Sequence, residues 1–444
     1  MRVHYHTFGC KANQYDTERM RQEAEARGAT TSGRDDSDVV VVNTCTVTNQ
    51  ADADARRLIR RIHRERPEVR IVVAGCSAAL KEDDYRAMPG VSDVVPGHDP
   101  VAVATGIAGF GEGAGRPTTL TQIELRAGLD RIDSEPIGGE LLRTRSGAAR
   151  GWLKVQDGCD RKCSFCATRL ARGESRSRSP DEVIAEARLL AETHAELVVT
   201  GIHIGHYGID LEPRLSLSWL CARLLDEVPD VRFRLGSVEA TEIDDALLDL
   251  LADSDGRLAP HLHMPLQSGA DPVLRRMRRW HTREQYRARG LEIAARVPTL
   301  GLGADVITGF PGETEADHAD TRALIEELPF TYLHVFPFSP RDGTVAADLS
   351  DPVPQRIAGE RARELRELAQ DKGRAHRAAR AGTAAAVVVE GHGGTGLTED
   401  YLRVRIGSKE AASPVCSPWV RGTLLGDADH LYIDPPRTSP GIQA

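Results

Sequence analysis

Hydrophobic and polar positions alternate along residues 1 to about 100 in a repeating strand–helix order. Apolar runs predict strands and 3.6-residue periodicity predicts helices, in the order strand 2–8, helix 13–27, strand 39–42, helix 51–66, strand 69–74 and helix 81–88. This order requires crossover connections, so it predicts a parallel sheet covered by helices on both faces. The first region is therefore expected to be a doubly wound α/β domain.

A second series of strand–helix units occupies the middle of the chain. The expected strands are 152–156, 197–200, 231–235, 261–264, 302–308 and 332–336, with helices between them, one of which starts at Ser179-Pro180. About six such units in some 190 residues predict a partial (β/α)6 barrel of parallel strands. Active sites in barrels of this kind lie at the carboxyl ends of the strands.

The last part of the chain changes pattern again. A long arginine-rich helix is expected at 353–380, followed by short strands at 385–390, 401–406, 419–425 and 430–433, which suit a small β-barrel. Residues 101–150 are rich in Gly and Ala and keep no clear period, so they are interpreted as an interdomain connection.

Size and composition agree with several globular domains. A chain of 444 residues exceeds the roughly 250–300 residues of a single core. We find no apolar run of the ~18–20 residues that span a bilayer, no signal-peptide pattern and no disulfide framework, so a cytoplasmic protein without a membrane partner is expected. The net charge of −9 argues against indiscriminate binding to nucleic acid.

Three cysteines gather in one short stretch, Cys159, Cys163 and Cys166. Three thiolates in one loop can hold three irons of a cubane cluster and leave the fourth iron open to a substrate or cofactor. A structural zinc site and buried free thiols are the alternatives. Zinc usually takes two paired knuckles, and no second pair lies nearby in the chain, so the iron–sulfur interpretation is favoured.

Three further cysteines follow the first three buried strands. Cys10, Cys45 and Cys76 each come two or three residues after a strand, beside a Gly or a Thr. The carboxyl ends of parallel strands lie at one edge of a sheet, so these thiols should converge into a second three-thiolate site. The alternative is three core cysteines that never meet, because Cys is among the most buried residue types. Cys221 and Cys416 are isolated.

The local cysteine motif resembles that of the radical S-adenosylmethionine (SAM) enzymes, including the aromatic Phe165 before the last cysteine. Strand-end loops resemble further elements of that family: TGIHIGHYG at 200–208, RLGSVE at 234–239, LQSG at 266–269 and DVITGFPGE at 305–313. The resemblance implies a 4Fe–4S cluster whose open iron binds SAM. The residues it implies for cofactor binding are Phe165, Thr200, Gly201, Glu239, Gln267 and Ser268.

Two local features need separate interpretation. His203 and His206 are close enough to suggest a metal site, but a surface or polar-pocket role is favoured. After the third cysteine the family has hydrophobic residues and a proline, whereas this chain has Ala167-Thr168-Arg169-Leu170. The cluster ligands are intact, but the packing of that loop is expected to differ.

The amino-terminal segments TFGCKANQYD (7–16), NTCTVT (43–48) and AGC (74–76) resemble the methylthiotransferases, in which this domain carries an auxiliary 4Fe–4S cluster. The resemblance implies two 4Fe–4S clusters, held by Cys10, Cys45 and Cys76 and by Cys159, Cys163 and Cys166, with SAM as cofactor. It implies four regions: the methylthiotransferase domain 1–100, a linker 101–144, the radical SAM core 145–375 and a TRAM-like RNA-binding domain 376–444. No further catalytic side chain is identified.

Within that family, the first motif is most similar to the branch that adds a methylthio group to carbon 2 of N6-threonylcarbamoyladenosine at position 37 of tRNA. The implied partners are the tRNA anticodon stem-loop, SAM and an electron donor such as flavodoxin or ferredoxin. The branch acting on isopentenyladenosine is the alternative, and a branch modifying a ribosomal protein fits less well. A non-catalytic RNA-binding iron–sulfur redox sensor is the alternative from another class.

Arginine clusters supply candidate RNA contacts. One is the helix at 353–380, whose alternative interpretation is a solvated helix with ion pairs between successive turns. The other surrounds Trp280 and consists of Arg275, Arg276, Arg278, Arg279, Arg283, Arg287 and Arg289.

Overall fold

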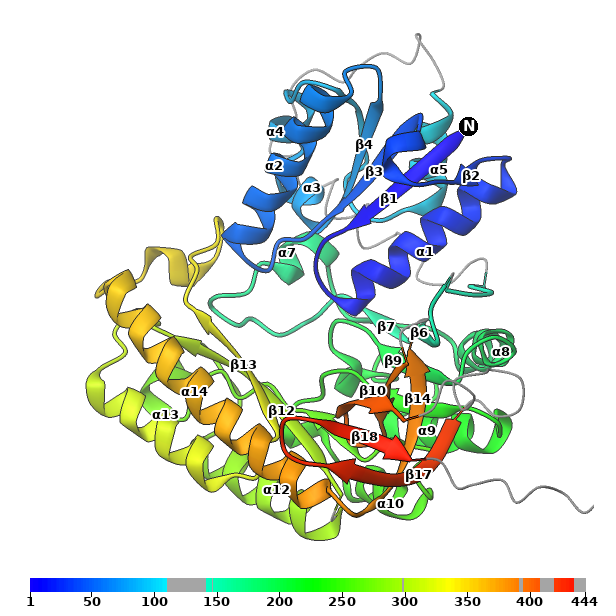
Figure 1. Cartoon of the computed structure of the whole chain (residues 1–444). Helices are drawn as coiled ribbons and strands as arrows, with labels where there is room; N and C mark the ends of the chain where they lie inside the picture. Colours follow the sequence, from blue (N-terminus) through cyan, green and yellow to red (C-terminus); the bar gives the residue numbers. More distant parts are fainter. Residues whose placement is uncertain (110–140, 146, 298, 391–393, 408–418, 435–444) are drawn as a thin grey trace, which may run out of the picture.

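The computed structural model describes residues 1–109, 141–145, 147–297, 299–390, 394–407 and 419–434. It has three parts, an amino-terminal α/β layer, a central array of parallel strands and a small carboxyl-terminal barrel (Figure 1). Among these described residues, none of the helices is both long and apolar enough to cross a membrane.

The amino-terminal part is a five-stranded parallel sheet with the order β2-β1-β3-β4-β5. Its strands are β1 (Arg2–Thr7), β2 (Thr30–Thr31), β3 (Val39–Thr44), β4 (Arg70–Gly75) and β5 (Val91–Val94). Its helices are α1 (Lys11–Ala26), α2 (Asn49–Glu65), α3 (Cys76–Leu80), α4 (Glu82–Arg86) and α5 (Pro100–Ala108).

Both faces of this sheet are covered, as the continuous apolar strands require. Alternate valines of β3 point to opposite sides: Val39 and Val41 pack with side chains of α1 and α5, and Val40 and Val42 pack with α2 and α4. The doubly wound fold is therefore confirmed. Helix α5 extends this layer to Ala108, inside the segment interpreted from sequence as a connection.

The central part contains six parallel strands in two hydrogen-bonded groups, β6-β9-β10 and β11-β12-β13. Bridges between Phe233 and Leu258 and between Ser237 and His263 connect β10 to the β11 side, so the six strands form one partial barrel. The strands are β6 (Arg150–Lys154), β9 (Glu196–Thr200), β10 (Arg232–Leu235), β11 (His261–His263), β12 (Gly301–Thr308) and β13 (Tyr332–Pro337), and β7 (Gln156–Asp157) pairs with β8 (Arg176–Ser177) beside them.

Helices alternate with these strands and pack on them through one continuous apolar core. Most of their starts are capped by a side chain. At the start that the sequence predicts, Ser179 accepts a hydrogen bond from the backbone N–H of Glu182. The helices are α7 (Thr168–Arg172), α8 (Pro180–Ala191), α9 (Leu217–Glu227), α10 (Asp245–Asp253), α11 (Asp271–Arg276), α12 (Arg283–Arg296), α13 (Glu315–Glu327) and α14 (Gln355–Arg380). Short 3-10 turns lie at Ile204–His206, Ala240–Glu242 and Val345–Asp348.

Helix α14 leads into a closed five-stranded barrel with the order β14-β15-β16-β18-β17. Its strands are β14 (Ala384–Glu390), β15 (Thr395–Thr398), β16 (Arg403–Ile406), β17 (Trp419–Gly426) and β18 (Leu431–Asp434). It docks at the amino ends of the central strands. There Arg234 donates to the carbonyl oxygens of Thr398 and Glu399 (both 2.9 Å), and the ring of Tyr401 stacks on His261 at 4.3 Å.

The predicted fold class is confirmed in all three parts, while four short strands, β2, β5, β8 and β15, were missed. Strand β5 carries Ser and Asp within its four residues, and β15 begins Thr395-Gly396, so neither has an apolar pattern. Both form because a neighbouring strand supplies hydrogen-bond partners, which is information that local sequence lacks.

Candidate active site

The local cysteine triad lies in the loop between β7 and α7, at the carboxyl ends of the barrel strands. Cys163 and Cys166 are held in one turn by a backbone hydrogen bond of 3.3 Å. Burial raises the pKa of Cys159 to about 12, and the charges of Cys166 and Cys163 oppose its ionisation further. The three thiols therefore share one space, where a bound cation centre would stabilise their thiolate forms.

A polar group from the β9 loop lies against this triad. His203 is buried, and its Nδ1 lies 3.6 Å from the Sγ of Cys159, while its Nε2 lies 2.8 Å from a carboxylate oxygen of Glu242. Arg161 contacts the same carboxylate at 3.1 Å and stacks on Trp280. His203, His206 and Glu242 offer ligand atoms within 4.8 Å of one another, while the guanidinium of Arg161 beside the same carboxylate competes with a cation, so the polar-pocket role of His203 stays a prediction.

Arg279 reaches the triad from the other side. Its side chain is only 3% exposed, and its Nη1 lies 3.7 Å from the Sγ of Cys163 while Nη2 pairs with the carboxylate of Glu239. Burial raises the pKa of Glu239 to about 7, against the opposing charge of Arg279. Glu239 is thus placed near the cluster loop with a carboxyl group that changes charge near neutral pH.

Two other residues that the resemblance implied for SAM binding lie in the cluster loop and at the end of β9. Phe165 packs edge-on against Phe310 at 6.5 Å, so it supports the loop. Gly201 follows Thr200 at the end of β9, and a Cβ there would lie 2.7 Å from the carbonyl oxygen of Gln156, which only glycine avoids.

The β11 loop supplies two more of these residues. Gln267 has a positive φ of 67°, and its backbone joins β12 through hydrogen bonds of 2.8 and 2.9 Å. Its side chain is half-buried at the strand ends. Ser268 is buried, and its hydroxyl contacts Thr321 and the backbone N–H of Ala270, so that group is already used inside the protein.

The three distant cysteines also come together, at the edge of the amino-terminal sheet. A Cβ on Gly9, which has a φ of +97°, would lie 2.6 Å from the Sγ of Cys45, so the β1 loop touches the β3 loop directly. Burial raises the pKa of Cys45 to about 12, and the charges of Cys76 and Cys10 raise it further. The convergence expected from strand ends is what the structure has.

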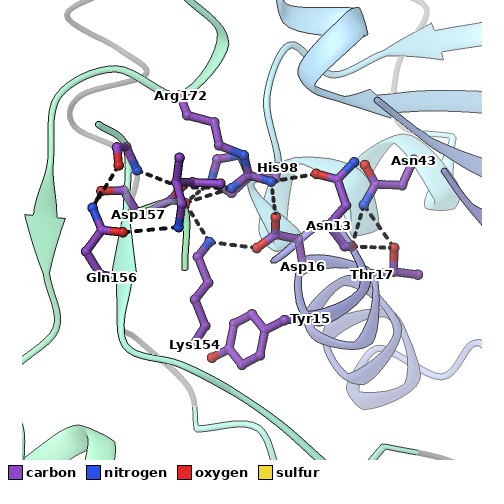
Figure 2. A network of polar contacts seen from close by, with 12 residues as sticks. Asn13, Tyr15, Asp16, Thr17, Asn43, His98, Lys154, Gln156, Asp157 and Arg172 are labelled. Atoms are coloured by element: carbon purple, nitrogen blue, oxygen red, sulfur yellow. Dashed lines mark hydrogen bonds and ion pairs between the residues drawn. The ribbon is translucent and has the colours of Figure 1, made fainter. Parts of the chain in front are cut away.

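A buried ionic network joins the amino-terminal part to the barrel (Figure 2), and one of its members also contacts this triad. Arg172, fully buried at the end of α7, donates from Nε to the Sγ of Cys76 at 3.2 Å. Its other nitrogens bind Asp157 of the barrel at 2.9 Å and Asp16 of α1 at 2.7 Å. Lys154 also bridges these two carboxylates. The two cysteine loops are therefore connected through one guanidinium.

The charges of this network balance. Although burial alone would raise it, Arg172 and Lys154 hold the pKa of Asp157 well below its usual value, and His98 adds a contact of 2.9 Å. The guanidinium also favours the thiolate form of Cys76, whose pKa burial raises to about 11. Each triad thus has three converging thiols and an arginine beside one of them, which fits a 4Fe–4S cluster with three cysteine ligands.

The sequence did not predict that Arg172 and Arg279 contact the cysteine triads. Arg172 follows the segment where the chain departs from the family pattern, and Arg279 was assigned to a surface for polyanions. That assignment needs correction, because Arg279 points inward and several neighbours have protein partners. Arg276 donates to the carbonyl of Gly312, and Arg287 pairs with Glu327. Only Arg275 and Arg278 of this group stay exposed without such partners among the described residues.

The inner wall of the barrel carries a polar cluster on β11, β12 and β13. His263 and His334 both lie 3.2 Å from one oxygen of Asp305, and the hydroxyl of Tyr332 lies 3.1 Å from the Nδ1 of His263. His334 is 54% exposed, so the cluster is open to a ligand. Phe336, 44% exposed, continues this wall toward the strand ends.

The barrel and its cysteine loop define a radical SAM enzyme. The "Radical SAM superfamily" model matches residues 153–325, and the model "Uncharacterized protein family UPF0004" matches residues 2–97. Among solved structures, the radical S-adenosylmethionine methyltransferase TsrM from Kitasatospora setae is similar in fold, with a TM-score of 0.57 at 17% identity over 75% of this chain and 72% of that chain.

Similar curated proteins identify the family within the radical SAM enzymes. The chain is 38% identical to threonylcarbamoyladenosine tRNA methylthiotransferase MtaB of Bacillus subtilis (strain 168), over 82% of this chain and 79% of the relative. It is 36% identical to the tRNA-2-methylthio-N(6)-dimethylallyladenosine synthase of Sorangium cellulosum (strain So ce56), over 88% and 83%. The chain belongs to the radical SAM methylthiotransferases that act on tRNA, enzymes that use SAM and two 4Fe–4S clusters.

Proposed function

We propose that this enzyme adds a methylthio group to carbon 2 of N6-threonylcarbamoyladenosine at position 37 of tRNA, beside the anticodon. A base in the anticodon loop is single-stranded and can be turned out into a protein cavity. When bound, SAM and the two clusters supply the radical that removes the C2 hydrogen atom and the sulfur and methyl that replace it, with electrons from a donor such as flavodoxin or ferredoxin.

The residues of the chain have separate tasks in this proposal. Cys159, Cys163 and Cys166 hold the cluster that binds SAM, and Cys10, Cys45 and Cys76 hold the auxiliary cluster. Glu239 accepts a hydrogen bond from the amino group or ribose of SAM, and Gln267 contacts the same cofactor. The glycine at 201 lets the backbone of the β9 loop approach SAM closely.

The polar inner wall supports the choice of base. A threonylcarbamoyl group carries a carboxylate, a hydroxyl and a urea, whereas a dimethylallyl group is a hydrocarbon. The side chains of the wall around His263, Asp305, Tyr332 and His334 bond one another, and His334, 54% exposed, still faces solvent. A polar substituent can replace the water at that side chain, whereas a hydrocarbon cannot. The polar substituent is therefore the better match. Several of the similar curated relatives have this activity in their names.

The second candidate is the dimethylallyl substrate, which the name of the Sorangium cellulosum relative supports at nearly the same identity. The two candidates predict different changes in tRNA when the gene is deleted. Nucleosides from digested tRNA of the deletion strain and its parent should be compared by mass spectrometry. We expect loss of the methylthio form of threonylcarbamoyladenosine and accumulation of its unmodified form.

A catalytically impaired allele makes this test specific. The deletion strain carrying the wild-type gene should regain the methylthio nucleoside, and the same strain carrying Cys163→Ala should not. Retention of that nucleoside in the deletion strain would reject the proposed substrate. Loss of the methylthio-dimethylallyl nucleoside in its place would establish the second candidate.

A further inference from the structure

A cavity of about 410 Å³ lies where the three parts of the chain meet. Its lining comes from the start of α1, from the segment that leads into β6 and from the carboxyl-terminal barrel, with Lys11, Gln14, Arg145, Arg150, Glu390 and Tyr401 among its residues. The volume is in the range of small-ligand sites in proteins. Tyr401 also stacks on His261 of the inner barrel wall, so the cavity adjoins the barrel interior.

The cavity has more positive than negative charge. Glu390, the acidic residue in its lining, is already engaged by Arg150 at 2.7 Å and by Arg403 at 3.3 Å. The ammonium group of Lys11 has no ion pair or hydrogen bond with any described residue. The charged groups nearest to it are Arg150 and Arg234, the buried carboxylate of Glu196 and the thiol of Cys10. Arg145 stacks on Trp152 at 4.2 Å and has no carboxylate partner within the described ranges.

Arg150 adds a further buried donor to the lining, and its Nη1 faces the buried carboxylate of Glu196 at 3.7 Å. The Nη1 of Arg150 is buried and makes no hydrogen bond within the part of the chain that the structure describes. Buried N–H groups in native proteins are nearly always satisfied, by protein, water or ligand. An unpaired ammonium group, beside a guanidinium nitrogen whose carboxylate contact is only a long ion pair of 3.7 Å, leaves donors available to an anion.

We propose that Lys11, with Arg145 and Arg150, binds the carboxylate of the threonylcarbamoyl group, an inference that rests on the function proposed above. Lys11 directly follows Cys10, so an anion held there lies beside the auxiliary-cluster triad. In the substrate, C2 and the N6 substituent lie on the same edge of the purine. A carboxylate anchored at Lys11 therefore keeps the reacting edge of the base next to that triad.

The test measures the affinity of anaerobically reconstituted enzyme for anticodon stem-loop RNAs that differ only at position 37. The RNAs carry adenosine, threonylcarbamoyladenosine, its methyl ester or dimethylallyladenosine. Fluorescence anisotropy gives each dissociation constant. We expect wild-type enzyme to bind the free carboxylate about tenfold more tightly than the uncharged ester, as a charge-assisted hydrogen bond implies.

Variants test whether Lys11 is responsible for the tighter binding of the carboxylate RNA. Lys11→Gln should lose most of the preference for the carboxylate over the ester, since only Arg145 and Arg150 remain, and Lys11→Arg should keep most of it. Arg143→Gln removes a nearby exposed charge that does not line the cavity and should behave as wild type. Iron content and circular dichroism of each variant check that it folds and carries its clusters.

Two outcomes would overturn the inference while leaving the proposed function in place. One is an unchanged preference for the carboxylate in Lys11→Gln. The other is an equal loss of affinity for all four RNAs, which would mean that Lys11 contacts an RNA phosphate. Tightest binding of the dimethylallyl RNA by the wild-type enzyme would instead reject the proposed function itself.

Discussion

The two cysteine triads have the same number of thiols but are assembled in different ways. Cys159, Cys163 and Cys166 belong to one loop, so their proximity follows from chain connectivity. Cys10, Cys45 and Cys76 are held together only by the register of three parallel strands. The first triad is therefore local and tolerant of changes elsewhere, whereas the second depends on the folded sheet.

The two triads also differ in which part of the chain supplies the residues that contact them. The barrel triad is contacted by His203 and Arg279, which belong to strand-end loops of the same barrel. The amino-terminal triad is contacted by Arg172, which comes from the barrel and is tied to carboxylates of both parts. This difference indicates that the barrel triad is a self-contained unit, while the other is completed by docking of the two parts.

The largest expected effect is on the barrel triad. Cys163→Ala removes one of three ligands, so the iron content should fall from about eight to about four per chain. Cleavage of SAM to 5′-deoxyadenosine under dithionite should be lost. Both are measured by iron analysis and by chromatography of the reaction mixture. Full SAM cleavage by this variant would contradict the assignment.

The matched change in the other triad should separate two activities. Cys45→Ala should lower the iron content by a similar amount but leave SAM cleavage intact, because the barrel triad does not depend on it. Methylthio transfer to tRNA, followed by mass spectrometry of nucleosides, should stop. Identical behaviour of Cys45→Ala and Cys163→Ala would show that the two triads do not have separate tasks.

Removing the guanidinium that connects the two triads should lower the free energy of unfolding. Arg172→Gln leaves Asp16 and Asp157 buried with less compensating charge, and loss of one partner from a buried ionic group typically costs about 3–5 kcal/mol. The free energy of unfolding in urea gives the value. Arg169→Gln, on the same helix, is the control. Its ion pair with Glu174 is exposed and should contribute less than about 1 kcal/mol. Equal effects would refute the special role of Arg172.

The smallest expected effect concerns pH. Because the pKa of Glu239 is raised to about 7, this carboxyl group is ionised above neutral pH and protonated below it. If the carboxylate accepts a hydrogen bond from SAM, the dissociation constant for SAM should rise about tenfold from pH 8 to pH 6. Glu239→Gln should flatten this dependence. An unchanged pH dependence in that variant would assign it to another group.

Several features could be predicted from local sequence because short-range patterns carry them. The 3+2 spacing of Cys159, Cys163 and Cys166 and the valine run of β3 each determine their structure within a few residues. The convergence of Cys10, Cys45 and Cys76 needed one more rule, that parallel strands end at one edge. The inward turn of Arg279 had no such signal, since an arginine in a basic stretch is usually exposed.

The sequence alone determined the fold class, the family and the local triad of Cys159, Cys163 and Cys166, because hydrophobic periodicity and close cysteine spacing are properties of short stretches of the chain. Only the tertiary structure decided which charged residues meet. Arg172 is 156 residues from Asp16 and Lys11 is far from Arg150 in sequence, yet each pair shares one buried space. Ionic contacts of this kind depend on how the domains dock, and no local pattern encodes the docking.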